Sequence, residues 1–350
     1  MEEVKAAVFG LNGDSTCGPD GFTRQFNQDS WEVIGEDIFN MVRDFFNSAG
    51  LPSFITHTNL VLLPKKKNVP TFSDMRPIRL SNLSNKIISR VNHERLVEIL
   101  PSLISPNQAG FVKGRSIKGN ILLTQEIITD IRLRGKPANM VIKLDMAKAY
   151  DRVSWLFFTK MLRQIGFGEI FTSEVLRRAL DALFDNPDFI GFGMLKWSQN
   201  INYLSYADDT IISCSSHYGA VQLIMNILGD YEAASGQKIN KEKSSVYMHE
   251  KAHADEVNIV YLITEFQRKY FPFSYLGCPI FYSRRKDFYK RIIFKVHERL
   301  SSWKGKLLSI GGRAVLIAHV LESMPIHLLS AVNPSVYVIN QLHKMFARFY

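Results

Sequence analysis

The chain has 350 residues and a mass of 40.0 kDa, which is long enough for two or three subdomains with their own hydrophobic cores. Hydrophobic residues make up 46% and charged residues 22%, which excludes a disordered protein, and a formal charge of +10 favours polyanionic partners, nucleic acid first. Its apolar runs all fall short of the ~20 residues that cross a membrane, the start Met1-Glu2-Glu3 is no signal peptide, and the three cysteines are too scattered for a disulfide framework. We therefore expect an intracellular protein of the cytoplasm or nucleus, with no membrane segment and no disulfide partners.

Two predicted strands in the first third of the chain carry a group of cations. A loop and a helix that starts at Trp31 precede these strands, which are expected at 60–63 and 76–80. A lysine run is most often a solvated face. Lys65 and Arg76 flank the strands closely enough, however, that both could reach one phosphate group.

A glycine-containing connection joins two predicted helices, 84–103 and 116–134. Its sequence is Asn-Gln-Ala-Gly-Phe-Val-Lys-Gly-Arg, residues 107–115. Two glycines near a phenylalanine and two cations suggest a close approach of the backbone to a ligand. An ordinary surface loop explains the same composition nearly as well.

A carboxylate lies at the end of an apolar strand expected at 140–146. This residue is Asp145, and a helix expected at 153–165 follows it. A lone aspartate in such a place is more often a helix cap or one half of an ion pair than a functional group. Asp145 becomes a stronger candidate if a second acidic group lies close by.

The stretch Tyr206-Ala207-Asp208-Asp209 supplies such groups. It lies between two apolar runs, 201–204 and 210–213, and is typical of the tip of a β-hairpin. Two adjacent carboxylates raise each other's pKa unless a cation lies between them. A hard divalent cation that prefers oxygen ligands, such as Mg²⁺, suits them, and with Asp145 the chain could assemble a three-carboxylate metal site.

The remaining chain is predicted to be mostly helical. Short strands are expected at 245–248 and 275–280 with a polar link between them, and helices at 173–184, 218–235 with Gly236 as a left-handed cap, 284–304, 312–323 and from Pro334 onward. The helix at 284–304 is strongly basic on one face. The last helix has no stop signal, which predicts a truncation inside this element.

Eight motifs follow one another along the chain. They are GPDGF (18–22), LLPKK (62–66), RPIRLSN (76–82), NQAGFVKGR (107–115), IKLDMAKAYDRVSW (142–155), YADDT (206–210), SGQKIN with a following KS (235–244) and YLG (275–277). In this order they resemble the reverse transcriptase of plant non-LTR, LINE-type retroelements, and the resemblance covers essentially the whole chain. Tyr-Ala-Asp-Asp alone would be a modest signal, whereas eight ordered matches are a strong one. The resemblance implies an α+β fold shaped as a right hand of fingers, palm and thumb, with a small antiparallel palm sheet.

The resemblance also implies a metal site. Asp145, Asp208 and Asp209 would bind two Mg²⁺ ions, with Mn²⁺ as a substitute. One ion would lower the pKa of the primer 3′-hydroxyl group, and the other would hold the triphosphate and stabilise the leaving pyrophosphate. Lys243 would protonate that pyrophosphate, although a solvated surface lysine explains its position equally well. The implied partners are an RNA template, a DNA primer and deoxynucleoside triphosphates.

Further residues receive binding roles from the same resemblance. Lys65 and Arg76 would contact the triphosphate, and Tyr150 would exclude a ribose 2′-hydroxyl group, so that deoxynucleotides are preferred. The basic helix at 284–304 would lie along the duplex backbone in a contact that does not depend on sequence. The primer and template would be bound by Gln108, Gly110 and Arg115 and, in the primer grip, by Tyr275, Leu276 and Gly277.

One segment of the family pattern is missing. Family members carry Gln-Gly-Asp-Pro between the two acidic strands, where it starts a palm helix and braces the template and the incoming nucleotide. This chain contains no such string, and only 63 positions separate Asp145 from Asp208. We infer an internal deletion near residues 171–173 and expect an incomplete palm with uncovered apolar surface and low solubility.

The implied organisation has four parts, a helical extension at 1–50, fingers at 51–139, a palm at 140–282 and a thumb-like region at 283–350. Three functions remain open. The carboxylate set favours a working RNA-directed DNA polymerase, the deletion favours a catalytically dead remnant, and the basic charge favours a noncatalytic nucleic-acid-binding protein derived from that fold. We expect the remnant.

Overall fold

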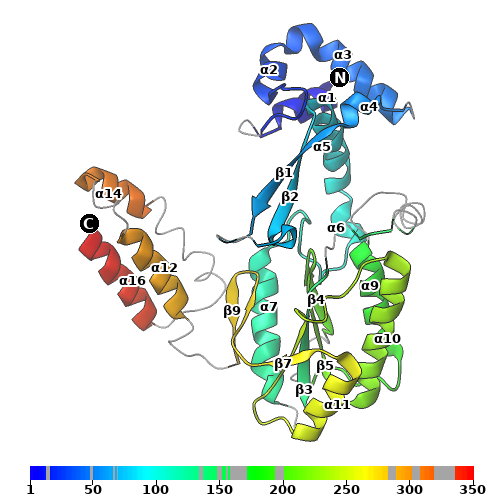
Figure 1. The fold of residues 1–350 in the computed structure, drawn as a ribbon, viewed down its shortest axis with the longest axis vertical. Helices are drawn as coiled ribbons and strands as arrows, with labels where there is room; N and C mark the ends of the chain where they lie inside the picture. Colours follow the sequence, from blue (N-terminus) through cyan, green and yellow to red (C-terminus); the bar gives the residue numbers. More distant parts are fainter. Residues whose placement is uncertain are drawn as a thin grey trace. The chain divides into compact units, whose positions relative to one another are not determined.

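The computed structural model describes residues 1–12, 16–47, 50–65, 68, 70–133, 137–147, 152–154, 157, 172–193, 201–282, 289–301, 308–318 and 336–350. These residues form two compact units, Met1–Leu103 and Ile104–Tyr350 (Figure 1). Tyr150 and most of the helix expected at 153–165 lie outside the described residues. The division into extension, fingers, palm and thumb stays a prediction.

The first unit consists of helices and one two-stranded arm. Its helices are α1 (Glu2–Phe9), α2 (Arg24–Asp29), α3 (Trp31–Phe46), α4 (Ser53–Thr56), α5 (Leu83–Val97) and α6 (Leu100–Leu103). Its core is formed by apolar side chains of α1, α3 and α5, among them Val8, Val42 and Val91. The single helix expected at 84–103 is divided into α5 and α6, because Pro101 has no N–H group to continue the backbone ladder.

The arm is an antiparallel hairpin of β1 (Thr58–Pro64) and β2 (Met75–Ser81). Its register pairs Leu63 with Arg76. Every residue of β1 is exposed, although Leu60 to Leu63 are all apolar. The arm is therefore held by backbone hydrogen bonds and cross-strand pairs rather than by a core of its own.

The first sequence motif anchors the end of this arm. Gly18 lies so close to the Ser81 carbonyl group that a Cβ atom at this position would overlap it, which only glycine avoids. The Asp20 carboxylate accepts a hydrogen bond of 2.7 Å from the backbone N–H group of Leu83, the first residue of α5. Asp20 thus caps α5 from a distant part of the chain, which gives this motif a structural role.

A five-stranded sheet in the order β4-β5-β3-β6-β7 is the centre of the second unit. Its strands are β3 (Asn139–Leu144), β4 (Tyr203–Tyr206), β5 (Asp209–Ser215), β6 (Ser245–Met248) and β7 (Gln267–Lys269). Neighbouring strands are antiparallel except β6 and β7, which run parallel. The expectation of an antiparallel sheet is therefore wrong at this edge, because α11 (Ala254–Thr264) carries the chain back so that β7 starts in the same direction as β6.

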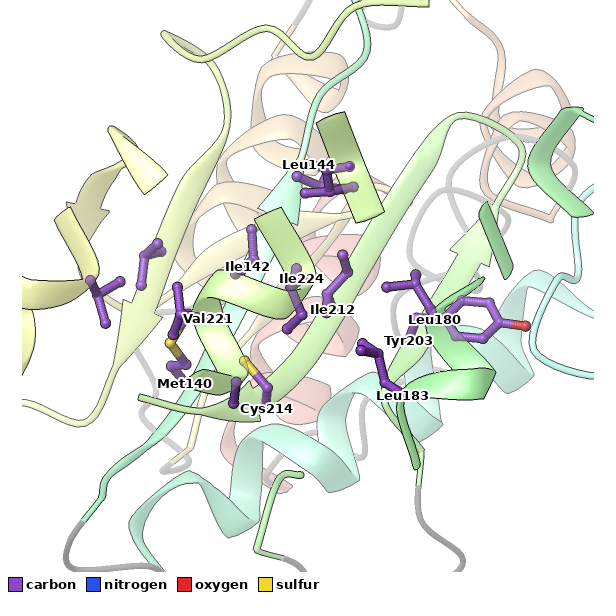
Figure 2. Packing of buried hydrophobic residues seen from close by; sticks show 14 of the residues in the cluster. Met140, Ile142, Leu144, Leu180, Leu183, Tyr203, Ile212, Cys214, Val221 and Ile224 are labelled. Atoms are coloured by element: carbon purple, nitrogen blue, oxygen red, sulfur yellow. The ribbon is translucent and has the colours of Figure 1, made fainter. Parts of the chain in front are cut away.

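Helices cover both faces of this sheet (Figure 1). They are α7 (Ile117–Thr129), α9 (Thr172–Asp181), α10 (Tyr218–Ser235) and α11. On β3, Ile142 and Leu144 pack with residues of α9, α10 and α11, and Figure 2 shows Ile142 near Ile212 and Ile224. Val141 belongs to the cluster on the opposite face, to which α7 contributes. Burial on both faces fixes the register, because a slip by one residue would exchange the two faces.

The link expected to be polar, between 248 and 275, contains α11 and β7 instead. The first turn of α11 is acidic, which favours a helix N-terminus, and Val260 is buried in the core. Tyr261 and Leu262 of the same helix are exposed. The apolar residues of α11 therefore lie on both its buried and its exposed face, so the spacing of apolar residues does not predict this helix.

The chain after the sheet forms a small hairpin and helices within the described residues. These elements are β8 (Phe273–Tyr275), β9 (Cys278–Ile280), α12 (Lys290–Leu300), α14 (Ile310–Leu316) and α16 (Val336–Phe349). Helices α12 and α16 pack together, and Val296 and Val338 are fully buried. Among the described helices, none combines the length and apolar composition needed to cross a lipid bilayer.

Candidate active site

Asp145 and Asp209 lie at the same end of two neighbouring strands. The β3–β5 register ends with Leu144 opposite Thr210, so Asp145 and Asp209 take the next position along each strand. Residues two apart on a strand share a face, which places Asp145 on the same face as Lys143. With Asp208 in the adjoining turn, three carboxylates from two distant stretches of the sequence lie near one end of the sheet.

The charges of these groups act on one another. Burial raises the pKa of Asp209; Lys143 lowers it, while Asp208 and Asp145 raise it. The Nζ atom of Lys143 also donates a hydrogen bond of 2.7 Å to the backbone carbonyl of Ser274. Lys143 therefore supplies part of the positive charge that neighbouring carboxylates require.

Asp208 lies in a two-residue turn with a strained backbone. Ala207 and Asp208 form this turn between the paired residues Tyr206 and Asp209. Ala207 has a φ of +56°, in the left-handed region that costs a residue with a Cβ atom about 1–2 kcal/mol. Two-residue hairpin turns need a residue with positive φ. Because Ala207 has a Cβ atom, the turn that presents the carboxylates is strained.

Gln108 fastens this turn from the loop before α7. Its Oε1 atom accepts hydrogen bonds from the backbone N–H groups of Ala207, at 3.0 Å, and Gly110, at 2.9 Å. Its backbone forms a parallel bridge with Ser205. Gln108 and Gly110, which we expected to bind primer or template, thus contact the acidic turn, and their role toward nucleic acid stays a prediction.

Arg115 holds the same loop from its other end. Its guanidinium group donates hydrogen bonds to the carbonyl groups of Ile104, Ser105 and Gln108. The planar fork of N–H donors suits several carbonyl acceptors at once. The guanidinium that we expected at the primer or template is therefore engaged with the protein backbone, and its contact with nucleic acid stays a prediction.

The backbone of Asp145 is fixed by the segment that precedes β6. The Asp145 N–H group donates to Ser244 Oγ at 3.1 Å, and the Asp145 carbonyl accepts from the Asn240 N–H group at 2.8 Å. Ser244 is fully buried, whereas the neighbouring Lys243 is exposed. Lys243 thus lies one residue from a tether of Asp145, and its role as an acid stays a prediction.

Tyr275 approaches the carboxylates from the β8–β9 hairpin. Its side chain is buried, and its hydroxyl oxygen accepts a hydrogen bond of 3.4 Å from Asn120 Nδ2. Asn120 Nδ2 also donates to the Ser205 carbonyl at 2.7 Å. Burial raises the pKa of Tyr275, and the negative charge of Asp209 raises it further. Tyr275 therefore lies within electrostatic reach of Asp209.

Leu276 and Gly277, expected in the primer grip, form the tip of that hairpin. Both have positive φ, +48° and +81°, as in the type I′ turns that join two strands tightly. The hydrogen bond from Lys143 to Ser274 ties this hairpin to β3. The hairpin thus lies on the face of the sheet that carries the carboxylates, and primer binding by its tip stays a prediction.

Lys65 and Arg76 belong to the first unit, at the end of the arm. The Lys65 N–H group donates to the Asp74 carbonyl at 2.8 Å, which continues the register by one position. Arg76 pairs with the residue two before Lys65, so the two cations are diagonal neighbours on one face. Arg79 lies on the opposite face. The arm therefore allows Lys65 and Arg76 to approach one phosphate group together.

The three carboxylates match Mg²⁺ in donor type. Carboxylate oxygens are the ligands this ion prefers, and the mutual repulsion at Asp209 favours a bound cation. Within the described residues, no three His, Cys, Asp or Glu side chains converge as a complete metal-binding group. Because Mg²⁺ usually takes one or two carboxylates and completes its shell with water and phosphate, this donor set fits an ion shared with a substrate.

Sequence reasoning missed two residues of this region. Lys143 precedes Asp145 by two positions, and the period of a strand is a signal that could have placed both on one face. Asn120 gave no local signal, because its partners Ser205 and Tyr275 are distant in sequence. Tyr150 is outside the described residues, so its expected contact with ribose stays a prediction.

A protein-family sequence model matches the first part of this region. The sequence model of the family described as reverse transcriptase (RNA-dependent DNA polymerase) matches residues 63–191. That range contains Asp145 and ends before the turn with Asp208 and Asp209.

Curated relatives include proteins of mobile elements. An uncharacterized 149 kDa protein of transposon TX1 from Xenopus laevis is 24% identical over 394 residues, in an alignment that takes in the whole chain and 30% of that protein. The retrovirus-related Pol polyprotein from the type-1 retrotransposable element R2 of Popillia japonica is 27% identical over 170 residues, 48% of this chain and 22% of that protein. A putative ribonuclease H protein from Arabidopsis thaliana is 35% identical over 72 residues, 20% of this chain and 12% of that protein. The chain spans less than a third of the length of each of these relatives.

Proposed function

We propose that this chain, which contains a reverse transcriptase domain of a LINE-type retrotransposon, retains the nucleotidyl-transfer site of that family. We also propose that it no longer synthesises DNA. The observation that carries the first half is the placement of Asp145 and Asp209 at the same end of β3 and β5, with Asp208 beside them. Burial and neighbouring negative charges raise the pKa of Asp209, so keeping it ionised costs free energy unless a cation binds beside it.

Mg²⁺ is the proposed cofactor, as two ions, with Mn²⁺ as the substitute. Asp145, Asp208 and Asp209 would hold it, and when bound it supplies positive charge that offsets the charge of a triphosphate during nucleotidyl transfer. Lys143 adds a fixed positive charge on the same face of the sheet. The protein itself thus positions three carboxylates and the Lys143 ammonium group at the end of the sheet.

The proposed substrates are a deoxynucleoside triphosphate, a DNA primer and an RNA template. Lys65 and Arg76 would bind the triphosphate, and Lys243 would protonate the leaving pyrophosphate. Tyr150 would select deoxynucleotides, and the β8–β9 hairpin with Tyr275 would hold the primer. These roles are supported by the matching motif positions and, for Tyr275, by its electrostatic coupling to Asp209.

The proposed architecture is a right hand, with an extension at 1–50, fingers at 51–139, a palm at 140–282 and a thumb at 283–350. Support comes from the sheet, which carries the carboxylates in the proposed palm, and from the cationic arm in the proposed fingers. Such a domain would act in the cytoplasm or nucleus, where RNA templates and DNA primers are found.

Loss of synthesis is proposed from the short connection between the acidic strands. The alignment with the TX1 protein has 394 positions against 350 residues in this chain, so at least 44 positions have no residue here. A deletion near 171–173 would account for part of that difference and would remove the template brace. A site that holds a cation but misplaces the template loses the orientation that nucleotide transfer requires.

Binding of a divalent cation tests whether the site is retained. Mn²⁺ titrated into the full chain and followed by electron paramagnetic resonance should bind, and Asp208→Ala should weaken binding by about tenfold or more. Asp185→Ala, in the 3-10 helix η3 (Ala182–Asp185), serves as the control and should leave the affinity unchanged. Equal Mn²⁺ affinity of the wild type and Asp208→Ala would contradict the proposal.

Binding of nucleic acid without catalysis is the second candidate. The formal charge of +10 and the two cations on one face of the arm favour it. Retention on an RNA–DNA duplex should then fall steeply as the salt concentration rises. Absence of binding at low salt, or binding that does not change with salt, would end this candidate.

A further inference from the structure

Gln108 lies inside the protein against the acidic turn, with only 6% of its surface exposed. Its Oε1 atom accepts hydrogen bonds from Ala207 N at 3.0 Å and from Gly110 N at 2.9 Å. Its Nε2 atom donates to the Ala207 carbonyl at 3.4 Å. One side chain thus pairs with both backbone polar groups of the residue that precedes Asp208.

Ala207 is the residue in this turn that needs support. Its φ of +56° is disfavoured for any residue with a Cβ atom, and a two-residue turn has few backbone hydrogen bonds with which to hold it. A change in this angle would swing the Asp208 side chain and shift Asp209 on the next strand. The direction of both carboxylates therefore depends on the conformation of Ala207.

The loop that carries Gln108 is itself locked to the turn. A Cβ atom at Gly110 would lie 2.5 Å from Ala207 N, so the two backbones are in direct contact. The Ser205 N–H group donates to the Asn107 carbonyl at 2.9 Å, and the Ser205 carbonyl accepts from the Ala109 N–H group at 3.1 Å. Gln108 is thus held in place independently of its own side chain.

We propose that Gln108 is a positioning residue, which keeps Ala207 in the left-handed conformation and so directs Asp208 and Asp209 toward a divalent cation. This role deepens the proposed function, on which its cation-binding part rests. It gives Gln108 a task inside the protein that differs from contact with primer or template.

Amide hydrogen exchange of the full chain, read residue by residue, tests the role directly. Gln108→Met keeps the length of the side chain and removes its hydrogen bonds, and it should speed exchange at Tyr206, Asp209 and Thr210 by about tenfold. Gln222→Met on α10, which removes a side-chain hydrogen bond of 3.0 Å from Gln222 to Asn226 on the same helix, is the matched control and should change nothing at the turn. Unchanged exchange at the turn, or equally faster exchange throughout α10, would overturn the proposal.

Ala207→Gly separates positioning from folding, because glycine takes a positive φ without strain. Added to Gln108→Met, it should restore slow exchange at Asp209 and Thr210 to within about threefold of the wild type. Mn²⁺ affinity should fall in Gln108→Met and recover in the double variant. Failure of the double variant to recover slow exchange would overturn the proposal. If Asp208→Ala leaves Mn²⁺ affinity unchanged, the proposed function fails, and the exchange measurements still decide the role of Gln108.

Discussion

The positive charge of Lys143 on β3 lowers the pKa of Asp209 on β5, whereas burial of Asp209 raises it. The same ammonium group is held by the Ser274 carbonyl, so it cannot leave the carboxylates without losing a hydrogen bond of 2.7 Å. One fixed lysine beside three carboxylates leaves the region with excess negative charge. A divalent cation would neutralise that excess, and the stability of the protein should reflect its binding.

Replacement of Asp209 by asparagine should stabilise the protein at pH 7 when divalent cations are absent. Because burial raises the pKa of Asp209, the folded protein binds this proton more tightly than the unfolded chain does. The protonated Asp209 side chain therefore contributes its full stability at low pH. That contribution is lost as the pH rises from the pKa of Asp209 in the unfolded chain through its pKa in the folded protein. Thermal unfolding should show a Tm advantage of a few degrees for Asp209→Asn near pH 7 that vanishes below about pH 4.

Addition of Mg²⁺ provides the control for this variant. The ion should raise the Tm of the wild type more than that of Asp209→Asn, which keeps two of the three carboxylates, and this reduces the difference between them. Asp185→Asn, at an exposed carboxylate of η3, should leave the Tm unchanged with and without Mg²⁺. An Asp209→Asn protein less stable than the wild type at pH 7 without divalent cations would contradict this explanation.

Asn120→Leu should destabilise the second unit by about 1–3 kcal/mol, because the Ser205 carbonyl and the Tyr275 hydroxyl lose a shared donor in a buried place. Tyr275→Phe keeps the ring and removes one partner, so it should cost about 0.5–1.5 kcal/mol. Urea unfolding measures the free energy of unfolding of each variant, provided that the variants and the wild type have equal m-values. A cost for Asn120→Leu no larger than that for Tyr275→Phe would show that the bond to Ser205 contributes little.

Ile142→Ala should reduce the free energy of unfolding by about 2–5 kcal/mol, because Ile142 is fully buried between β3 and the helices of one face (Figure 2). Leu262→Ala on α11 is the control, since Leu262 is 77% exposed and should change stability by less than about 0.5 kcal/mol. A comparable loss for both variants would mean that Leu262 is covered in solution.

Lys65→Ala and Arg76→Ala should each weaken binding to an RNA–DNA duplex and lower the slope of log affinity against log salt by about 1. Arg79→Ala removes the same kind of charge from the opposite face of the arm and should have the smaller effect. Fluorescence anisotropy over a series of salt concentrations measures both quantities. Equal losses from Arg76→Ala and Arg79→Ala would refute a contact made by one face.

Elements with one buried face and a clear end signal could be predicted from the sequence. Helix α10 has the expected bounds, and Gly236 caps it with a φ of +75°. Strand β6 also has the expected bounds. Helix α11 could not be predicted in this way because it exposes Leu262 and other apolar residues, and the parallel pairing of β7 depends on that helix.

The carboxylates of the candidate site could be predicted, but the residues that hold them could not. Asp145, Asp208 and Asp209 end or join apolar strands, where a charged group is costly without a function, so their sequence context singled them out. Gln108 and Arg115 are polar loop residues whose local sequence is equally suited to a ligand or to a neighbouring backbone. Their partners at Ala207 and Ile104 are decided by tertiary structure, which local sequence does not record.

Primer extension on an RNA template with Mg²⁺ shows whether this chain still synthesises DNA. The proteins to compare are the full chain and the same chain with the Gln-Gly-Asp-Pro segment of a related element inserted after Phe171, each with and without Asp208→Ala. We predict that the full chain gives no more product than its Asp208→Ala variant, and that the insertion restores synthesis which Asp208→Ala abolishes. Extension by the uninserted chain above its Asp208→Ala variant would show that the chain is still active. An inserted chain that makes no product would show that the missing segment is not what stops synthesis.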